Sequence, residues 1–482
     1  MAEVQQHIIK KFSLELETAD NGEQYKLQRR CSNLVKEKMT PAMDEIFTAN
    51  FPGNSVTRIS KIEIDLGNID ADKLEEIFIQ ECLKQLKQKI KSIANASSAS
   101  EAIAIQLISE GQNILEQFFY FLETGILPLP ASGNDIKEWE QNIIAAVKEQ
   151  EDFFTGHFQQ LIQKRHVASE RLVAQFDINF INALLYAAGI TGGNAISSVY
   201  EKLQLKIEAQ LSVTAEKLLF AALIKTFCSL QVKDRQQFLS VITESPDALI
   251  TAGDEYPKTF AQWEQLIYAF GKKDFLPQQK GEIAKAYKEI TKDNNEKQIA
   301  EKKEETINVI KSAAVFIDNA GLVILHPFFE TMFETLGFTQ NKSFVNDASR
   351  YRALHLLQYM VNNEEATPEY ILPLNKLLCG IPAEEHIERF ITLNENEKKE
   401  ALELLQAVIS HWSALKHTSA EGLQEAFLRR RGKLSFNKTD AYWKLQVEKS
   451  AIDILLNKLP WGYSYIQLPW MQHRLVTEWQ SY

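Results

Sequence analysis

The chain has 482 residues, of which 45% are hydrophobic and 24% are charged, so it is long enough for roughly two to four folded domains. Its 64 acidic and 53 basic residues give a formal net charge of −11, which argues against a general affinity for nucleic acid or anionic lipid. No apolar run reaches the roughly 20 residues of a membrane helix, and the N-terminus lacks the apolar core of a signal peptide. The four cysteines form no CxxC pair. We therefore expect a cytoplasmic protein with reduced thiols, no cofactor and no membrane insertion.

Residues 1–93 are predicted to form a small mixed module in the order β-α-β-α. The first strand is indicated by Phe12, Leu14 and Leu16, which alternate with polar residues as in a half-buried strand. A second strand with the same alternation is expected over 57–67. Because two strands alone form a marginal sheet, a further strand must come from the middle of the chain or from a partner protein.

The two helices of this module follow the strands in sequence. The first is expected from about residue 24 to 49, and Pro41 should kink or divide it because proline cannot donate the backbone hydrogen bond of a helix interior. The second is expected over about 70–93, where apolar residues recur at helical spacing.

The rest of the chain is predicted to be helical, so the fold class is mainly α. Small residues over 94–100 suggest a first boundary, and helical patterns then fill a middle region that spans 94–290. The almost wholly polar run at 291–306 is interpreted as a charged linker. Residues 307–482 should form a helical, aromatic-rich C-terminal domain.

The stretch around His326-Pro327 is the most distinctive part of this C-terminal domain. An apolar run ends at this pair, and Pro327 should bias His326 away from helical geometry and open a new helix. That helix carries a phenylalanine- and methionine-rich face, and Gly337 follows it where a residue with positive φ is common. We take His326, Pro327, Phe328 and Phe329 as candidate anchors of a core or of an assembly surface.

Aromatic residues are concentrated toward the C-terminus, where five of the seven tryptophans lie between positions 412 and 479. Two Leu-Pro-Trp turns end at Trp461 and Trp470, and Met471 follows the second. Large aromatic residues beside prolines are typical of rigid buried corners or of interface anchors. Trp412, Trp461, Trp470 and Met471 are therefore further candidate anchors.

The run Arg429-Arg430-Arg431 is the main cationic cluster of the sequence. Because it follows an apolar helical segment, it favours a helix C-terminus, where cations are stabilised by the helix dipole. The alternative is docking to an acidic protein surface, and these three arginines are kept as candidate interface residues.

Candidate catalytic and metal-binding residues are isolated from one another. None of the histidines and cysteines forms an HExxH motif or a paired Cys/His spacing; those considered are His326, His355, Cys379, His411 and His417. Cys379 lies on the apolar side of a predicted helix with no base nearby in sequence, so we interpret it as a buried small hydrophobe. We assign no catalytic, cofactor-binding or metal-binding residue.

Several long stretches resemble one known family. They are HIIKKFSLELE (7–17), ISKIEIDLGNI (59–69), NAGLVILHPFFETMFETLGF (319–338), RALHLLQYM (352–360), PEYILPLNKLLCGIP (368–382), LLQAVISHWSALKHTSAEGLQEAFLRRRGKL (404–434) and DILLNKLPWGYSYIQLPWM (453–471). In this order they resemble the contractile injection system tape measure proteins, whereas the middle of the chain does so only loosely. The resemblance implies a non-enzymatic structural or assembly protein of a bacterial phage-tail-like particle that controls tube length. It also implies inner tube, baseplate or cap components as partners.

The resemblance leaves the working form of the protein open. A fully helical ruler of this length would span roughly 720 Å, at about 1.5 Å per residue. The predicted strands, the 13 prolines and the aromatic corners favour a compact protein instead. An adaptor or chaperone for another particle component is the main alternative, and a cargo enzyme or effector with chemistry at Cys379 is another. Self-association and retention in the mature particle also stay open.

Overall fold

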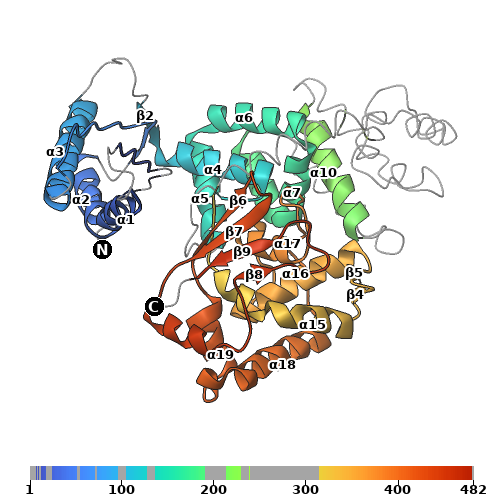
Figure 1. Cartoon of the computed structure of the whole chain (residues 1–482). Helices are drawn as coiled ribbons and strands as arrows, with labels where there is room; N and C mark the ends of the chain where they lie inside the picture. The colour runs from blue at the N-terminus through green and yellow to red at the C-terminus, as the bar shows by residue number, and fades with distance from the viewer. Residues whose placement is uncertain are drawn as a thin grey trace. The chain divides into compact units, whose positions relative to one another are not determined.

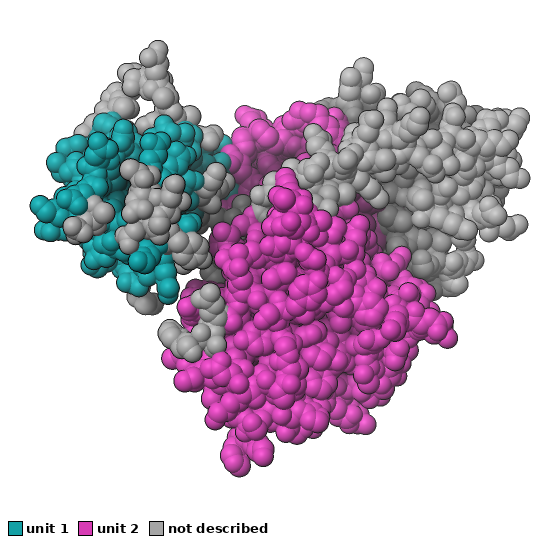
Figure 2. All heavy atoms as spheres, in the orientation of Figure 1, with its two compact units in different colours: residues 1–113 teal, residues 114–482 magenta. Residues whose placement is uncertain are grey.

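The computed structural model describes the following parts of the chain: residues 7, 9, 12–17, 24–51, 55–70, 73–95, 105–127, 136–189, 213–229, 238, 267 and 314–479. Within them the protein is mainly helical, which confirms the predicted fold class (Figure 1). The predicted linker at 291–306 lies outside the described residues. The chain divides into two compact units, residues 1–113 and 114–482, coloured teal and magenta in Figure 2.

The first unit is built on three helices around a small core. They are α1 (Gln24–Leu34), α2 (Thr40–Asn50) and α3 (Leu74–Asn95). A π-helical segment, η1 (Val35–Met39), joins α1 to α2 directly before Pro41, so the predicted interruption of the first helix is present. Buried side chains such as Met39, Ile46 and Phe78 form the core between these helices.

The strands of the first unit differ from those predicted. Residues 12–17 form no strand, and Phe12, Leu14 and Leu16 are each about 40% exposed. The second predicted strand is confined to β1 (Ser55–Ile59), which pairs antiparallel with β2 (Ile105–Ser109). Alternation in sequence indicates which face of a strand is buried, but a strand also needs a partner for its backbone N–H and C=O groups. Here β1 finds that partner later in the chain.

The helices of the middle region open the second unit. They are α4 (Glu110–Thr124), α5 (Ile136–Glu149), α6 (Glu151–Lys164), α7 (His166–Gln175), α8 (Ile178–Ala187) and α10 (Val213–Ser229). Their core is rich in aromatic rings that meet edge to face: the ring centroid of Phe118 lies 6.1 Å from that of Trp139 and 5.7 Å from that of Phe176. Asp177 caps α8, since its side chain accepts a hydrogen bond from the N–H of Phe180.

The C-terminal part of this unit contains a five-stranded sheet in addition to the predicted helices. Its strands are β3 (Val315–Ile317), β6 (Gly432–Asn437), β7 (Tyr442–Val447), β8 (Tyr465–Ile466) and β9 (Leu475–Glu478), in the spatial order β3-β6-β7-β9-β8. Figure 1 labels four of them, β6, β7, β9 and β8, in this order. Only the pairing of β7 with β9 is parallel. One face of the sheet is buried in the core through residues such as Leu434, Leu445 and Leu475. A helical domain is predicted here from the sequence, and this sheet is present in addition to the helices.

Helices and one small hairpin complete this part of the chain. The α-helices are α15 (Phe329–Thr335), α16 (Asp347–Asn362), α17 (Pro373–Leu378), α18 (Glu395–His411) and α19 (Ala420–Leu423). The hairpin consists of β4 (Thr339–Gln340) and β5 (Ser343–Phe344). Shorter turns are η4 (Ala320–Phe328), η5 (Glu369–Ile371), η6 (Ser413–Leu415) and η8 (Ala451–Lys458), which are 3₁₀-helices, and η7 (Gln424–Leu428), which is a π-helix.

The segment around His326-Pro327 is continuous where the sequence predicts a break. The 3₁₀-helix η4 runs through both residues, and α15 begins only at Phe329. A 3₁₀-helix has a tighter hydrogen-bonding pattern than an α-helix and is common in short pieces next to α-helix ends. Gly321 brings η4 against η7, because a Cβ atom on this glycine would lie 1.6 Å from the carbonyl oxygen of Phe427. The prediction for Gly337 is confirmed, since its φ is +70°.

Candidate functional site

Three tryptophan side chains hold the C-terminal segments together by donating their indole N–H groups to backbone carbonyls. Trp461 donates to the carbonyl oxygen of Ile324 at 2.9 Å, Trp470 to that of Leu378 at 2.8 Å, and Trp412 to one in η8 at 3.2 Å. Each acceptor belongs to a helical turn. Leu378 is the last residue of α17, where carbonyls lack partners within the helix, so the Trp470 indole satisfies a carbonyl that the helix leaves unpaired.

The contact of Trp461 has a specific cause in the sequence. In a 3₁₀-helix the N–H of residue 327 would bond to the carbonyl of residue 324. Pro327 has no N–H, so this donor is absent, and the Trp461 indole takes its place at the fully buried Ile324. The ring of Phe328 packs edge to face on the Trp461 ring, with the centroids 5.2 Å apart. The pair Pro327–Trp461 therefore joins segments that are 134 residues apart in sequence.

The remaining candidates of this region divide between core and surface. Phe329 is fully buried, and Met471 is only 6% exposed. Pro327 is exposed, whereas His326 is half-buried, with its Nδ1 atom 2.9 Å from the carbonyl oxygen of Val323. Burial lowers the pKa of His326, although the hydrogen bond to Val323 raises it in part. Trp412 is fully buried, so its ring serves packing in the core.

The three consecutive arginines have three different environments. Arg430 is 8% exposed and binds the carboxylate of Asp453 through two N–H groups, at 2.7 and 3.1 Å. Burial alone would raise the pKa of Asp453, but Arg430 and the backbone N–H of Ser450 hold this pKa below its usual value. Arg429 is exposed and donates to a backbone carbonyl in α16, and Arg431 is exposed and 3.7 Å from an acidic side chain of the segment before η4.

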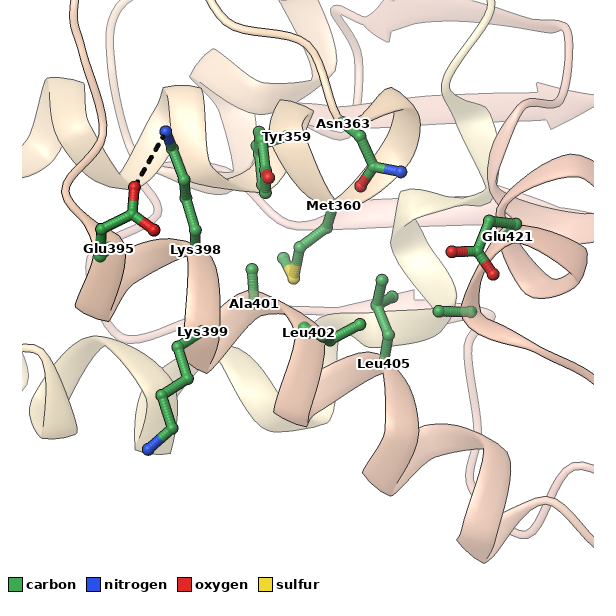
Figure 3. A pocket seen from close by; sticks show the side chains of 11 residues that line it. Tyr359, Met360, Asn363, Glu395, Lys398, Lys399, Ala401, Leu402, Leu405 and Glu421 are labelled. Atoms are coloured by element: carbon green, nitrogen blue, oxygen red, sulfur yellow. Dashed lines mark ion pairs between the residues drawn. The ribbon is translucent and has the colours of Figure 1, made fainter.

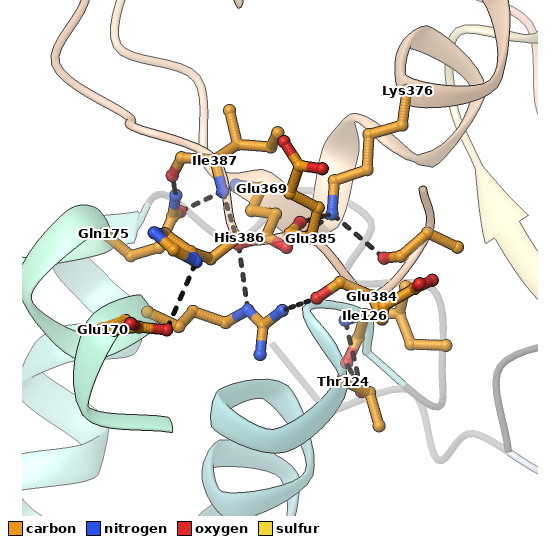
Figure 4. Close-up of polar contacts among 12 residues, drawn as sticks. Thr124, Ile126, Glu170, Gln175, Glu369, Lys376, Glu384, Glu385, His386 and Ile387 are labelled. Atoms are coloured by element: carbon orange, nitrogen blue, oxygen red, sulfur yellow. Dashed lines mark hydrogen bonds and ion pairs between the residues drawn. The ribbon is translucent and has the colours of Figure 1, made fainter. Parts of the chain in front are cut away.

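A buried ionic cluster, which the sequence analysis missed, joins the middle helices to the C-terminal segments (Figure 4). The fully buried Glu369 accepts from Arg171 Nε at 3.0 Å and from Lys376 Nζ at 2.6 Å. Arg171 also donates to the carbonyl oxygens of Leu122 and Glu384, at 2.6 and 2.9 Å. We call Arg171, Glu369 and Lys376 the buried triad. Glu369 and Lys376 are seven residues apart, but Arg171 lies 198 residues from Glu369, so no local motif indicates the complete triad.

The electrostatics of the buried triad follow from one carboxylate placed between two cations. Burial would raise the pKa of Glu369, but Arg171 and Lys376 overcome this effect and lower it. Burial lowers the pKa of Lys376, and Glu369 opposes that shift. The carboxylate is also closely packed, since a Cβ atom on Gly125 would lie 2.1 Å from Glu369 Oε1. This arrangement is satisfied internally and leaves the carboxylate no room for a substrate.

The residues considered for catalysis do not form a reactive site. Cys379 is fully buried, and burial raises the pKa of its thiol, which suppresses the thiolate that a nucleophile requires. His355 is buried with Nε2 2.7 Å from the carbonyl oxygen of Glu388, while His411 and His417 are exposed. Among the described residues, no three His, Cys, Asp or Glu side chains gather into a group that could hold a metal ion.

One surface groove of about 410 Å³ lies among α16, α18 and α19 (Figure 3). Apolar side chains such as Met360 and Leu405 line it together with charges of both signs, including the ion pair between Lys398 and Glu395. Its lining holds no histidine, cysteine or serine. The groove therefore offers no serine, cysteine or histidine for catalysis, and its two lysines and two glutamates give it no dominant charge.

These features describe a mainly helical protein whose distinctive residues pack its own segments together. The profile of one family, described as contractile injection system tape measure protein, matches residues 6–479, nearly the whole chain. The chain belongs to this family. Neither a search of curated proteins nor a search of solved structures finds a match. Within the part of the chain that the structure describes, no helix has the length and apolarity needed to cross a membrane.

Proposed function

We propose that this protein is a non-enzymatic assembly factor of a bacterial phage-tail-like contractile injection particle and that it helps to set the length of the particle's tube. The observation that carries the proposal is the family match over residues 6–479, which covers nearly the whole chain. The contacts of the notable side chains support the proposal, because Trp461, Arg430 and the buried triad all bind groups of the protein itself.

The helix lengths favour a working form that is folded rather than stretched through the tube. The longest helix among the described residues, α3, has 22 residues and therefore spans roughly 33 Å, at about 1.5 Å per residue. Residues 114–482 form one compact unit instead of a rod. We therefore place the protein at one end of the tube, where it contacts inner tube, baseplate or cap components.

The compact unit formed by residues 114–482 also suits one alternative function. In this alternative, the protein is an adaptor or chaperone that leaves before the particle is complete. The two functions differ in what the mature particle contains. A retained factor stays in purified particles, whereas an adaptor is absent from them but binds one particle protein during assembly.

Negative-stain imaging of particles from a strain that lacks this protein tests the proposal. We expect missing particles or a broadened distribution of tube lengths, with recovery when the wild-type chain is restored. A Cys379→Ala chain should restore the particles equally well, because the buried thiol has no chemical role. Uniform particles of normal length from the deletion strain would rule out the proposal, and quantitative mass spectrometry of purified particles separates a retained factor from an adaptor.

A further inference from the structure

The outer face of the C-terminal sheet carries side chains that the core does not use. Along each strand, residues that point into the core alternate with residues that are partly or fully exposed. The exposed side chains include Phe316 on β3, which is 40% exposed, and Tyr465 on β8, which is 59% exposed. Because β3 and β8 are the two edge strands, these aromatic residues lie at opposite sides of this face.

Charge on this face is opposite in sign to that of the chain as a whole. Lys433, Lys444 and Arg474 point outward, against one outward carboxylate, Glu478, which pairs with Lys444 at 2.6 Å. The full chain has a net charge of −11. No carboxylate among the described residues pairs with Lys433 or Arg474. An excess of positive charge on one face of an acidic protein suits an acidic partner.

The Arg474 side chain contacts two aromatic rings, and among the described residues its guanidinium has no hydrogen-bond acceptor or ion-pair partner. Its guanidinium lies over the ring of Tyr442, 5.4 Å from the centroid, and over the ring of Tyr465, 5.8 Å from the centroid. The register explains this arrangement: Trp443 of β7 pairs with Leu475 of β9, so Tyr442 lies beside Arg474, the residue directly before β9. Contacts with ring faces use none of the guanidinium N–H groups, which leaves them available to bind a carboxylate through two parallel hydrogen bonds.

We propose that the outer face of the C-terminal sheet, centred on Arg474 between Tyr442 and Tyr465, docks an acidic segment of another particle protein. This inference rests on the proposed function and adds to it the surface and the chemistry of the partner. Arg430 takes no part in this site, because its guanidinium is already bound to Asp453. A carboxylate of the partner binds Arg474, and Lys433 adds attraction at the other end of the face.

Binding of the full-length chain to the purified tube, baseplate and cap proteins, each measured separately by biolayer interferometry, tests this inference. We expect one of them to bind, and we expect binding to weaken as salt rises from about 100 to about 500 mM. Arg474→Glu should weaken it roughly tenfold or more, and Arg474→Lys should weaken it less. Tyr465→Phe keeps an aromatic ring and should bind normally. The control is Lys399→Glu on α18, where the lysine is also exposed but lies outside the sheet.

Three outcomes would overturn the inference: no particle protein binds the wild-type chain, Arg474→Glu binds as tightly as wild type, or this variant loses only its binding to a single-stranded DNA used as a polyanion control. In cells, the comparison of Arg474→Glu with the deletion strain separates this inference from the proposed function. If deletion alters the particles but Arg474→Glu leaves their length and their content of this protein normal, the docking face is wrong and the assembly role stands. If deletion changes nothing, the assembly role fails, and the binding measurements alone decide on the docking face.

Discussion

At the scale of single residues, the recurring device of this protein is a side-chain donor that satisfies a buried backbone carbonyl. The indoles of Trp412, Trp461 and Trp470 do so in the C-terminal core, and Arg171 does so beside the buried triad. A buried carbonyl without a donor costs about 1–3 kcal/mol, so the loss of any one of these contacts should measurably lower the free energy of unfolding. These three tryptophans, which are candidate interface anchors in the sequence, thus donate their indole N–H groups to carbonyls of the chain itself.

The pairing of Trp461 with Pro327 predicts a non-additive response to mutation. Trp461→Phe keeps an aromatic ring but leaves the buried Ile324 carbonyl without its donor, so we expect a loss of about 1–3 kcal/mol in the free energy of unfolding. Pro327→Ala restores a backbone N–H that can donate to the same carbonyl. Urea denaturation of the two single variants and the double variant measures this. The double variant should lose less free energy of unfolding than the two single variants lose together. Strict additivity would show that Pro327 is not the cause of the indole contact.

Burial of His355 predicts a dependence of stability on pH. Burial lowers the pKa of this imidazole to about 4 from its ordinary value of 6.5. Between these values the unfolded chain binds more protons than the folded one, so stability falls as the pH falls. From pH 7 to pH 5 we expect this residue to account for a loss of about 2 kcal/mol, measured as a shift of the urea midpoint. His355→Gln, which keeps a donor for the Glu388 carbonyl, should be less sensitive over this range. If the stability of wild type and of His355→Gln fell equally between pH 7 and pH 5, His355 would not be the cause.

At the scale of elements, two short helices end in the same way. In α15, the N–H of Phe338 bonds to the carbonyl of Phe333 and the N–H of Gly337 to that of Glu334. In α17, the N–H of Ile381 bonds to the carbonyl of Lys376 and the following turn passes through Gly380, whose φ is +66°. Both are Schellman motifs, in which the residue after the helix adopts the left-handed conformation that glycine accepts most readily.

The two glycines differ in their surroundings, and this difference predicts different mutational costs. A Cβ atom on Gly337 would meet nothing within 4 Å, so Gly337→Ala should cost only the backbone strain of about 1–2 kcal/mol. A Cβ atom on Gly380 would lie 2.3 Å from the carbonyl oxygen of Trp470, so Gly380→Ala should cost about 1–3 kcal/mol more. Thermal unfolding of both variants measures the difference. A similar loss for both would mean that the segment of Trp470 moves away easily.

At the scale of the whole molecule, contacts between distant segments create structure that no single segment contains. The buried triad takes Arg171 from α7, Glu369 from η5 and Lys376 from α17. The parallel pairing of β7 with β9 joins segments that are about 30 residues apart, around a connection that contains the Trp461 and Trp470 turns. Residues 114–482 are one compact unit because of such contacts.

The buried triad predicts a large loss of stability when its single carboxylate is neutralised. Glu369→Gln keeps the shape of the side chain but leaves Arg171 and Lys376 buried without an anion, so we expect a loss of about 3–5 kcal/mol. The control is Lys399→Ala, which removes an exposed i,i+4 ion pair and should cost less than about 1 kcal/mol. Urea denaturation of both variants provides the comparison, and a loss below about 1 kcal/mol for Glu369→Gln would show that the cluster relaxes or admits water.

The pairing of β1 with β2 predicts where the first unit can be cut. A fragment of residues 1–113 contains both strands, whereas a fragment of residues 1–93 lacks β2. We expect the longer fragment to unfold cooperatively and the shorter one to be less stable, because a strand without its partner loses its backbone hydrogen bonds. Circular dichroism melting of the two fragments measures this. Equal melting temperatures would mean that β2 contributes nothing to the first unit.

The features that were predicted correctly depend on residues close together in sequence, whereas features that depend on distant residues were not predicted. Helix periodicity, the interruption before Pro41 and the positive φ of Gly337 depend on neighbours within one or two turns, and all three are found in the structure. The strands β6 and β7 also alternate in sequence, with Leu434 and Leu445 on the buried face, and this signal was available. The two-residue strand β8 and the parallel partner β9 carry too little local pattern to be recognised.

By itself, the sequence determined that this is a mainly helical protein, that its C-terminal third is rich in aromatic corners, and that it belongs to the tape measure family, because periodicity and motif order are properties of the chain. Only the tertiary structure decided what the notable residues contact. It directs the tryptophan indoles and Arg430 inward, assembles the buried triad from three separate segments, and leaves Arg474 exposed between two tyrosine rings. The physical reason is that burial and charge pairing depend on contacts between residues from distant parts of the chain. The spacing of residues within one segment does not determine those contacts.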